Sequence, residues 1–385
     1  MNVIHKNSAD DHDVRPALDS FCRCVVIKIG SAVLLQDAGF CQDTFRDLVE
    51  GVVQIRKRGV KVVVVCSGAV ALGLERLGLN KRPDNLSAVQ AVASVGQGIL
   101  AHKWSEELSL MDISTAQILL THDDLHDRRR FISARNTLRA LINMDAVPII
   151  NENDVVSTEE LPLFGDNDQL AVSFAALAGA SHLFFLTSAP GLLVCEKQTD
   201  GSFKDVVLSE VKKVNQELLQ HCQRPGTNVG RGGMESKVRA AGKSISFGIN
   251  AYITAGKEPN TVLKILDGTQ VGTHFLAHGS KLRGYRQWLA AGALSQGELH
   301  VDSGAEQALR VHKKSLLLSG VCEIQGNFSA KDPVNIFNLQ HELIGVGLVA
   351  QSAQALRLLL QQSEANGHTR AVIHRDDLFL ADGHL

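Results

Sequence analysis

The 385-residue chain lacks the features that mark membrane, secreted and nucleic-acid-binding proteins. No stretch approaches the roughly 18 consecutive apolar residues that a membrane-spanning helix requires. Neither sign of charge is in excess, because 39 Lys and Arg face 41 Asp and Glu, which leaves a formal net charge of -2. This balance predicts neither a membrane nor a nucleic-acid partner. With 44% hydrophobic and 21% charged residues, the composition is that of an ordinary globular protein.

Cysteine is scarce and scattered. Of the seven cysteines, Cys22 and Cys24 form the closest pair, and they lack the C-x-x-C spacing of zinc and redox sites. We interpret the cysteines as reduced, mostly buried thiols of a cytoplasmic protein. His122 and His126 have the i, i+4 spacing of metal ligands on a helix, but no third ligand is near, so we predict a solvated helix start and no metal site. Residues 1–20 are acidic and contain no apolar run, which predicts a loose leader instead of a signal peptide.

Strand-like and helix-like segments alternate over the first three quarters of the chain. Continuous apolar runs predict strands at residues 24–29, 60–66, 113–120, 147–150 and 182–187. Amphipathic or apolar segments predict helices at residues 43–58, 87–110, 128–144, 167–177 and 234–247. This alternation predicts an α/β fold, a three-layer sandwich with a mostly parallel central sheet covered on both faces. In such sheets ligands bind beyond the carboxyl ends of the strands.

The last quarter of the chain has a different sequence pattern. Short apolar runs punctuated by glycine predict a small β-rich domain over residues 297–385, with one helix near residues 353–361. We expect the main domain over residues 21–288 and a linker over residues 289–296. From Gln296 onward, seven Lys and Arg against ten Asp and Glu give a net charge of -3. The tail therefore lacks the basic footprint of a nucleic-acid binder.

Two polar clusters surround one short loop, in PIINENDVVSTEELPLFGDNDQL at residues 148–170. The run Asn151, Glu152, Asn153, Asp154 follows the fourth predicted strand, and Gly165-Asp166-Asn167-Asp168 precedes a predicted helix. Asn and Asp also favour turns and helix caps, which is the alternative interpretation. Since both clusters lie at the ends of elements, we expect them to hold a small, polar, zwitterionic ligand.

Three further signals lie at element ends. Lys28 ends the first strand, Ser67-Gly68 follows the second, and Thr187 ends the fifth, so one site could gather them.

A glycine-rich loop at residues 226–233 precedes the helix that carries Lys237. Free backbone N–H groups at such a helix start are an anion site, although a mobile surface loop with an exposed lysine is the alternative. No Walker-type G-x-x-x-x-G-K-[ST] occurs, so this is not a P-loop protein.

The order of these motifs is more specific than any one of them. VVIKIGS, SGAVALG, RRRFISARNTLRAL, PIINENDVV, GDNDQL and GRGGMESK follow one another along the chain. In this order they closely resemble the amino acid kinase family, in particular its glutamate-phosphorylating members, from about residue 24 to residue 288. In the tail, GELHVDSGAEQAL and HRDDLF resemble the PUA domain that bacterial members carry. The resemblance implies an amino acid kinase-like fold followed by a PUA-like domain.

The resemblance also implies an activity. We expect ATP-dependent phosphorylation of the side-chain carboxylate of L-glutamate, with Mg²⁺, as the first step of proline biosynthesis. Feedback inhibition by proline and a homo-oligomer, dimer or tetramer, are implied as well. Two alternatives stay open: another enzyme of this fold acting on a different small acid, or a regulatory or RNA-binding protein that uses its tail on a decayed kinase. The intact Lys28, Asp154, Asn167, Asp168 and Lys237 argue against decay.

Specific residues receive roles from the resemblance. Phosphoryl transfer to a carboxylate needs no general base, because the nucleophile is ionised near neutral pH, so catalysis depends on positioning and positive charge. The residues expected to act in catalysis are Lys28, Lys237, Asp168 and Asp166. Those expected to bind the substrate are Ser67, Gly68, Asp154 and Asn167. Those expected to bind ATP are Lys28, Thr187, Ser188, Arg231, Gly232, Gly233, Met234, Glu235, Ser236 and Lys237.

The chain departs from the family pattern at two positions near the nucleotide. Residues 187–192 read TSAPGL, where the family usually shows T-D-x-x-G-L, so Ser188 replaces an acidic residue and Pro190 is added. Arg231 stands where a small hydroxyl residue is common. We expect the missing charge to leave a looser nucleotide site, while the phosphate chemistry is kept.

Overall fold

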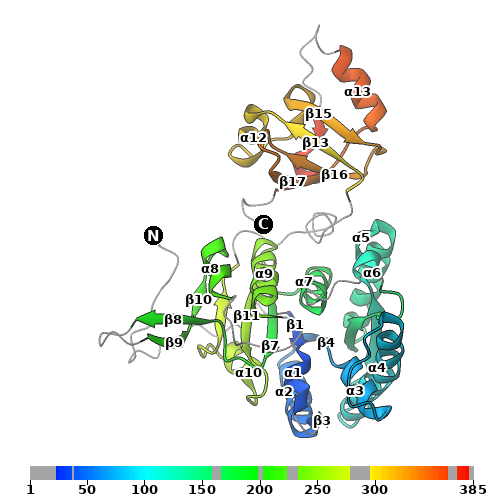
Figure 1. Ribbon diagram of the computed structural model, residues 1–385, viewed down its shortest axis with the longest axis vertical. Coiled ribbons are helices and arrows are strands. Elements are labelled where there is room, and N and C mark those ends of the chain that lie inside the picture. Colours follow the sequence, from blue (N-terminus) through cyan, green and yellow to red (C-terminus); the bar gives the residue numbers. More distant parts are fainter. Residues whose placement is uncertain are drawn as a thin grey trace. The chain divides into compact units, whose positions relative to one another are not determined.

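The computed structural model describes residues 23–36, 39–157, 166–197, 203–222, 233–277, 295–362 and 371–380. The chain forms two compact units, one of residues 1–124 and 132–281 and the other of residues 125–131 and 282–385 (Figure 1). The predicted leader and most of the predicted linker lie outside the described residues, so the predicted domain boundaries stay predictions. Among the described residues, no helix is long and apolar enough to cross a membrane.

An eight-stranded sheet forms the centre of the larger unit, in the order β10-β12-β11-β7-β1-β4-β6-β5. Its strands are β1 (Cys24–Ile29), β4 (Lys61–Cys66), β5 (Thr115–Leu120), β6 (Val147–Glu152), β7 (His182–Thr187), β10 (Glu210–Val211), β11 (Asn250–Ala255) and β12 (Thr273–Phe275). All neighbours pair in parallel except β11 and β12. The predicted mostly parallel sheet is confirmed. The sequence did not predict β10, β11 and β12, which extend the sheet beyond β7.

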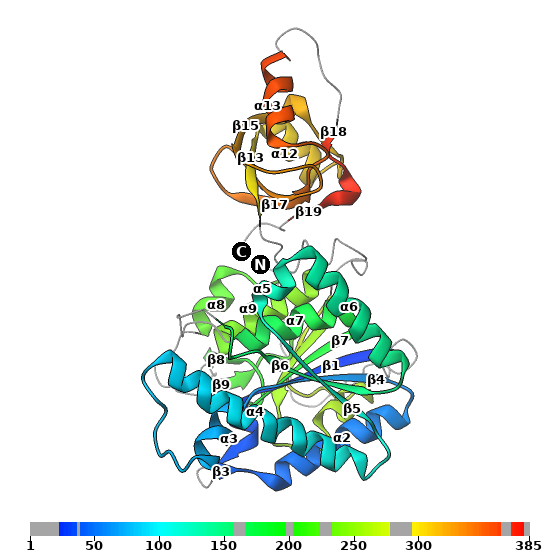
Figure 2. The same ribbon diagram turned by 90° about the vertical axis from the view of Figure 1, so that its right-hand side faces the viewer.

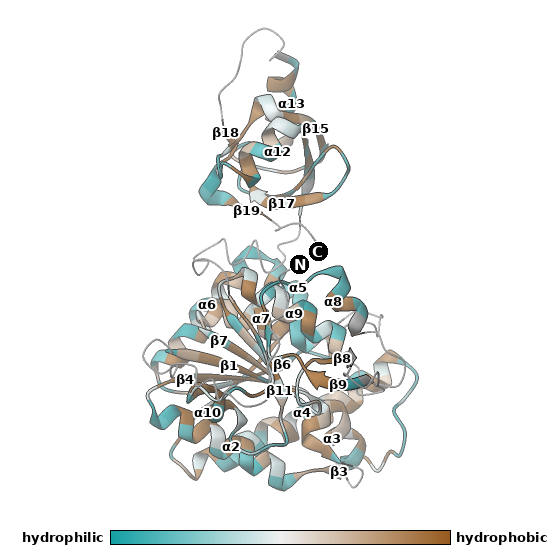
Figure 3. Cartoon of the chain, turned by 90° about the vertical axis from the view of Figure 1, so that its left-hand side faces the viewer, coloured by the Kyte–Doolittle hydropathy of each residue, from teal (hydrophilic) through white to brown (hydrophobic). Residues whose placement is uncertain are grey.

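Helices cover both faces of this sheet (Figures 2 and 3). On one side lie α1 (Ser31–Leu34), α2 (Gln42–Lys57), α3 (Ala69–Arg76), α4 (Leu86–Ser109) and α10 (Thr261–Leu266). On the other lie most of α6 (Arg128–Asn143), together with α7 (Asp166–Ala178), α8 (Gln216–His221) and α9 (Met234–Ser246). The short helix α5 (His122–His126) precedes α6. Two hairpins, β2 (Leu35–Gln36) with β3 (Gly39–Phe40) and β8 (Leu193–Lys197) with β9 (Phe203–Val207), complete the described elements. The three layers are those that the alternating pattern predicted.

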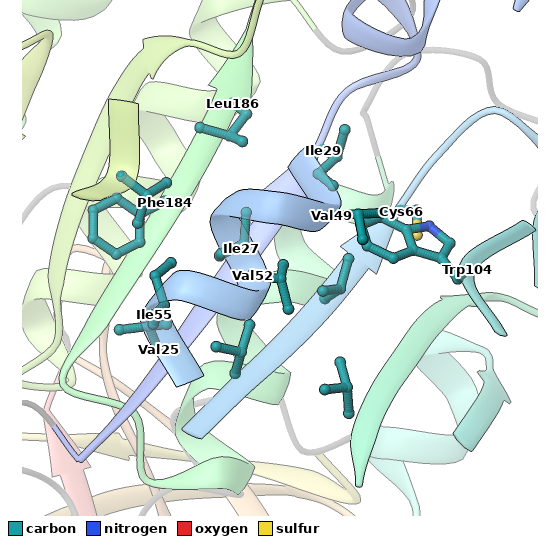
Figure 4. Packing of buried hydrophobic residues seen from close by; sticks show 14 of the residues in the cluster. Val25, Ile27, Ile29, Val49, Val52, Ile55, Cys66, Trp104, Phe184 and Leu186 are labelled. Atoms are coloured by element: carbon teal, nitrogen blue, oxygen red, sulfur yellow. The ribbon is translucent and has the colours of Figure 1, made fainter. Parts of the chain in front are cut away.

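Strand β1 shows how the sheet divides its side chains between the two layers. Val25, Ile27 and Ile29 belong to the core under α2, where Val52 packs beside them (Figure 4). Successive side chains of a strand point to opposite faces, so Lys28 points to the other layer, which contains α7 and α9. All six residues of β1 are buried, as expected for a central parallel strand. The alternation thus places the one charged side chain of β1 in the buried layer that contains α7 and α9.

Helices α3 and α4 cross closely enough that their backbones touch. A Cβ added at Gly96 would overlap the carbonyl oxygen of Ala69, and one added at Gly73 would overlap that of Val92. Helix α3 starts directly after Gly68, whose φ of 117° lies in the left-handed region that favours glycine. The crossing therefore fixes α4 against the first turn of α3, at the carboxyl end of β4.

The smaller unit has its own sheet and core. Its five strands run in the order β15-β13-β16-β17-β19, and β14 pairs with β18. The elements are β13 (Gly297–Val301), α12 (Ser303–Arg310), β14 (Leu316–Leu317), β15 (Val321–Gly326), β16 (Pro333–Phe337), β17 (Leu343–Leu348), α13 (Ala353–Gln362), β18 (Ala371–Ile373) and β19 (Leu378–Leu380). Short 3-10 turns lie at Leu318–Gly320 and Arg375–Asp377. The β-rich prediction is confirmed, and the helix predicted near residues 353–361 is α13, but the sequence did not predict the second helix, α12. Helix α12 has only eight residues and buries only Leu309, so no apolar run marks it in the sequence.

Candidate active site

Three charged side chains meet beyond the carboxyl end of β1. Lys28 Nζ lies 2.7 Å from Asp168 Oδ1, and Lys237 Nζ lies 3.3 Å from Asp168 Oδ2. Ser236 Oγ donates a hydrogen bond to the same Oδ2 at 3.0 Å. Asp168 is fully buried, and Lys28 and Lys237 are 4% and 5% exposed. We refer to Lys28, Asp168 and Lys237 as the lysine pair with its bridging aspartate.

Local structure explains why these residues meet. Lys28 points toward α7 because of its place in the alternation of β1. Asp168 lies in the first turn of α7, which packs against β1 and α9, and Lys237 lies in the first turn of α9. The two lysines are thus brought together from elements more than half the chain apart. The expectation that Asp168 lies between them matches the geometry, while the roles in catalysis stay predictions.

The charges of this group explain its pKa shifts. Burial would raise the pKa of Asp168, but the ammonium groups of Lys28 and Lys237 and the hydrogen bond from Ser236 hold it below its usual range. Burial lowers the pKa of Lys237, and the charge of Lys28 adds to this effect, while Asp168 opposes it. Two ammonium groups and one carboxylate leave a formal charge of +1. A buried positive charge of this kind attracts an anion.

A chain of amide and hydroxyl groups lies next to this charged group. Asn167 Nδ2 donates to Ser67 Oγ at 2.9 Å and to Asn151 Oδ1 at 3.0 Å. Asn151 Nδ2 in turn donates to Gln97 Oε1 at 2.6 Å. We refer to Gln97, Asn151, Asn167 and Ser67 as the amide relay. Because Asn167 precedes Asp168 on α7, the relay and the lysine pair adjoin.

The structure corrects the prediction for the first polar cluster. The fourth strand was expected to end at residue 150, but β6 continues through Glu152 and pairs there with β5. Asn151 is therefore a strand residue, 4% exposed, and not part of a loop. Asp154 lies in the turn that follows and is half-buried. The predicted cluster is therefore divided: Asn151 belongs to the buried amide relay, and Asp154 lies in the turn after β6.

The residues predicted to bind ATP are only partly described. Gly233 precedes α9, and Met234, Glu235, Ser236 and Lys237 form its first turn. Glu235 accepts hydrogen bonds from the exposed Arg239. Thr187 ends β7, and Ser188 follows it as an exposed residue. Arg231, Gly232 and the side chain of Asp166 lie outside the described residues, as does Gly165, so these predictions have no structural counterpart.

The described residues offer no set of ligands for a resident metal ion. They contain no group of three or more His, Cys, Asp or Glu side chains that could hold an ion. Asp168 is already neutralised by two ammonium groups, which makes it a poor ligand for a cation. The donor set of the described site does not fit a resident Mg²⁺. The Mg²⁺ expected with ATP would therefore belong to the nucleotide co-substrate.

Sequence reasoning missed Gln97 altogether and assigned Asn151 no individual role. Gln97 is 8% exposed and lies in the buried stripe of α4, which also contains Ala93, Leu100 and Trp104. A long polar side chain in such a stripe requires a hydrogen-bond partner. That was the available signal, but the pattern alone could not identify the partner, which is 54 residues away.

Comparison with known proteins agrees with the fold of both units. The family model described as "Amino acid kinase family" matches residues 23–255, and the model described as "PUA domain" matches residues 297–374. A "Glutamate 5-kinase" from Streptococcus pneumoniae (strain 70585) is 38% identical over 355 residues, which cover 92% of this chain and 95% of that protein.

Relatives from other bacteria are equally similar. A "Glutamate 5-kinase" from Myxococcus xanthus is 38% identical over 371 residues, 94% of this chain and 97% of that protein. One from Halorhodospira halophila is 38% identical over 362 residues, 92% of this chain and 96% of that protein. The similarity thus extends over both units of the chain.

Proposed function

This chain belongs to the amino acid kinase family, and on that basis we propose that it transfers the γ-phosphoryl group of ATP to the side-chain carboxylate of L-glutamate. The product is L-glutamyl 5-phosphate, and the reaction is the first step of proline biosynthesis. The observation that carries the proposal is the buried lysine pair with its bridging aspartate. The relatives named glutamate 5-kinase, which match nearly the whole chain, support the choice of substrate.

The reaction needs charge and position more than proton transfer. A carboxylate oxygen of glutamate attacks the γ-phosphorus, a new O–P bond forms, and the bond between that phosphorus and the β,γ-bridging oxygen breaks. The electron pair leaves with ADP, and no proton has to move, because the attacking carboxylate is already ionised. What opposes the step is repulsion between two anions. Lys28 and Lys237 offset this repulsion where charge spreads over the transferring group.

Asp168 gives the two lysines their position. Two buried ammonium groups would repel each other without a carboxylate between them. By pairing with both ammonium groups, Asp168 offsets their repulsion and holds them beside one another. Since the three groups hold a fixed geometry before the nucleotide arrives, little reorganisation is needed during transfer.

The glutamate is oriented by groups next to the lysine pair. Ser67 Oγ accepts from Asn167, which leaves its own O–H free to donate to a carboxylate. The backbone N–H groups around Gly68 can receive the same carboxylate, and Asp154 can pair with the α-ammonium. Mg²⁺ would arrive with ATP, held by its phosphates. A cytoplasmic homo-oligomer that responds to proline is part of the same proposal.

A substrate panel tests the proposal. ADP release is measured with L-glutamate, L-aspartate and N-acetylglutamate at equal concentrations, and the acyl phosphate is trapped with hydroxylamine. We expect turnover with L-glutamate far above the other two acids, and a hydroxamate only in its presence. Preferred turnover of another acid would assign the chain a different substrate within the same fold. No turnover with any acid would contradict the proposal.

A further inference from the structure

The amide relay has a direction, which runs from α4 to the start of α7. Gln97 Oε1 accepts from Asn151 Nδ2, which leaves Asn151 Oδ1 to accept from Asn167 Nδ2. The second hydrogen of Asn167 Nδ2 is donated to Ser67 Oγ. Both donors of Asn167 are therefore used within the protein. Its Oδ1 is the atom that remains to receive a hydrogen bond.

That oxygen is buried and has no hydrogen-bond partner among the residues that the structure describes. A buried carbonyl oxygen without a donor is costly, so a site that leaves one in place is prepared for a donor from a ligand. Glutamate near neutral pH offers its carboxylates only as acceptors. Its α-ammonium is the one group of the substrate that can donate. The available oxygen of Asn167 therefore favours a ligand that carries an ammonium group.

We propose that Gln97 is a positioning residue that sets this preference without touching the substrate. Its carbonyl oxygen fixes the orientation of the Asn151 amide, which fixes that of Asn167, so that Asn167 presents an acceptor to the α-ammonium. If Asn151 Nδ2 lost Gln97 Oε1 as its acceptor, the side-chain amide of Asn151 could flip. Asn167 would then no longer be held with its Oδ1 available to the ligand. The inference rests on the proposed function, because it identifies the ligand as an amino acid.

The fold supports this role by holding Gln97 in place. Gln97 directly follows Gly96, where α4 lies against Ala69 in the first turn of α3. Three residues further along α4, Leu100 is fully buried in the core. Because the helix is fixed on both sides of it, the side chain of Gln97 has little freedom to turn to another hydrogen-bond partner. The close helix crossing therefore brings a donor-and-acceptor side chain to the buried end of the relay.

The main test is Gln97→Met, which keeps the length of the side chain and removes the acceptor. We expect KM for L-glutamate to rise about tenfold, the effect of losing one hydrogen bond to a buried partner. The KM for ATP and kcat should change little. Glutarate has both carboxylates but no ammonium, so its Ki as a competitor of glutamate should stay unchanged. A general loosening of the site would weaken both acids equally and would overturn the inference.

Two further variants separate positioning from stability. Gln97→Glu keeps an acceptor for Asn151 and should keep most of the affinity for glutamate. Leu108→Ala removes a fully buried side chain elsewhere on α4 and should lower the Tm without changing the ratio of glutamate KM to glutarate Ki. If Leu108→Ala changes that ratio as Gln97→Met does, the effect is structural and the inference is wrong.

A double-mutant cycle gives the decisive result. If Gln97 acts through Asn167, Gln97→Met should have no further effect on kcat/KM for glutamate once Asn167→Ala is present. Additive losses would overturn the inference. The wild-type protein distinguishes this failure from failure of the proposed function. Turnover of glutamate by the wild type together with additive losses rejects only the role of Gln97, whereas no turnover by the wild type rejects the function itself.

Discussion

Replacing Asp168 by Asn tests the physics of the site, because it removes one charge and almost no volume. In the native protein Asp168 is fully buried, forms an ion pair with Lys28 at 2.7 Å and accepts a hydrogen bond from Lys237 at 3.3 Å. The carboxamide would leave two buried ammonium groups facing each other. Breaking a buried ion pair by removing one partner costs roughly 3–5 kcal/mol. We expect Asp168→Asn to lower the free energy of unfolding by about that amount at pH 7.

The pH dependence of this loss can be worked out from the shifted pKa. Asp168 has a folded-state pKa below its usual range. Its contribution to stability is therefore fully present above its unfolded pKa of about 3.9 and is lost as the pH falls through the folded-state value. The difference in the free energy of unfolding between the wild type and Asp168→Asn should stay constant from about pH 8 to pH 5 and become smaller below about pH 4. Urea denaturation followed by circular dichroism at each pH measures it.

Asp145 provides a matched control, because its carboxylate also lies between two cations. It accepts from Lys61 at 2.5 Å and lies 3.3 Å from Arg56, but its side chain is 65% exposed. Its φ of 66° is also a conformation that Asn tolerates well. Asp145→Asn should leave the unfolding transition almost unmoved. If the two variants were equally destabilised, or if Asp168→Asn cost less than about 1 kcal/mol, the account of a buried charge group would be refuted.

Three other substitutions test separate parts of the site. Asp154→Ala should raise KM for glutamate strongly and leave KM for ATP almost unchanged in steady-state kinetics; equal rises would mean that Asp154 is not at the amino group. Gly96→Ala should lower the Tm and raise KM for glutamate, since its methyl group would push α4 away from α3; an unchanged melting curve would contradict the close crossing. Ser188→Asp should lower KM for ATP several-fold. Residue 188 is exposed, so we expect the gain to stay below the roughly 1.5 kcal/mol, about tenfold, at the low end for a charged hydrogen bond. Weaker ATP binding in this variant would show that the loop suits a different nucleotide geometry.

Much of the larger unit could be predicted because its central strands are continuous apolar runs. The end of β6 could not, since Asn151 and Glu152 are poor strand formers. They join the strand through their pairing with Leu119 and Leu120 of β5, a contact between distant residues that composition does not encode. Tertiary pairing overrides local preference at this strand end, which lies at the predicted site.

The same limit applies to the site. Lys28 could be singled out because a lysine interrupts an apolar strand, and the resemblance to a family linked it to Lys237. The hydrogen bonds of Gln97 and Asn151 depend on how closely α3 and α4 cross. Gly96 allows that crossing, but a single glycine within a helix does not identify the residue that it faces. The relay is therefore a property of packing that only the structure contains.

The central claim is that two lysines supply the positive charge for phosphoryl transfer, and their replacement tests it most directly. Lys28→Met and Lys237→Met are compared with Lys243→Met, a lysine on the same helix as Lys237. The measurement is kcat for ADP release at saturating L-glutamate and ATP, with folding checked by circular dichroism. We expect each of the first two variants to lose at least about a hundredfold in kcat, on the order of 3 kcal/mol, while Lys243→Met stays close to wild type. Near-normal turnover in folded Lys28→Met and Lys237→Met would contradict the account.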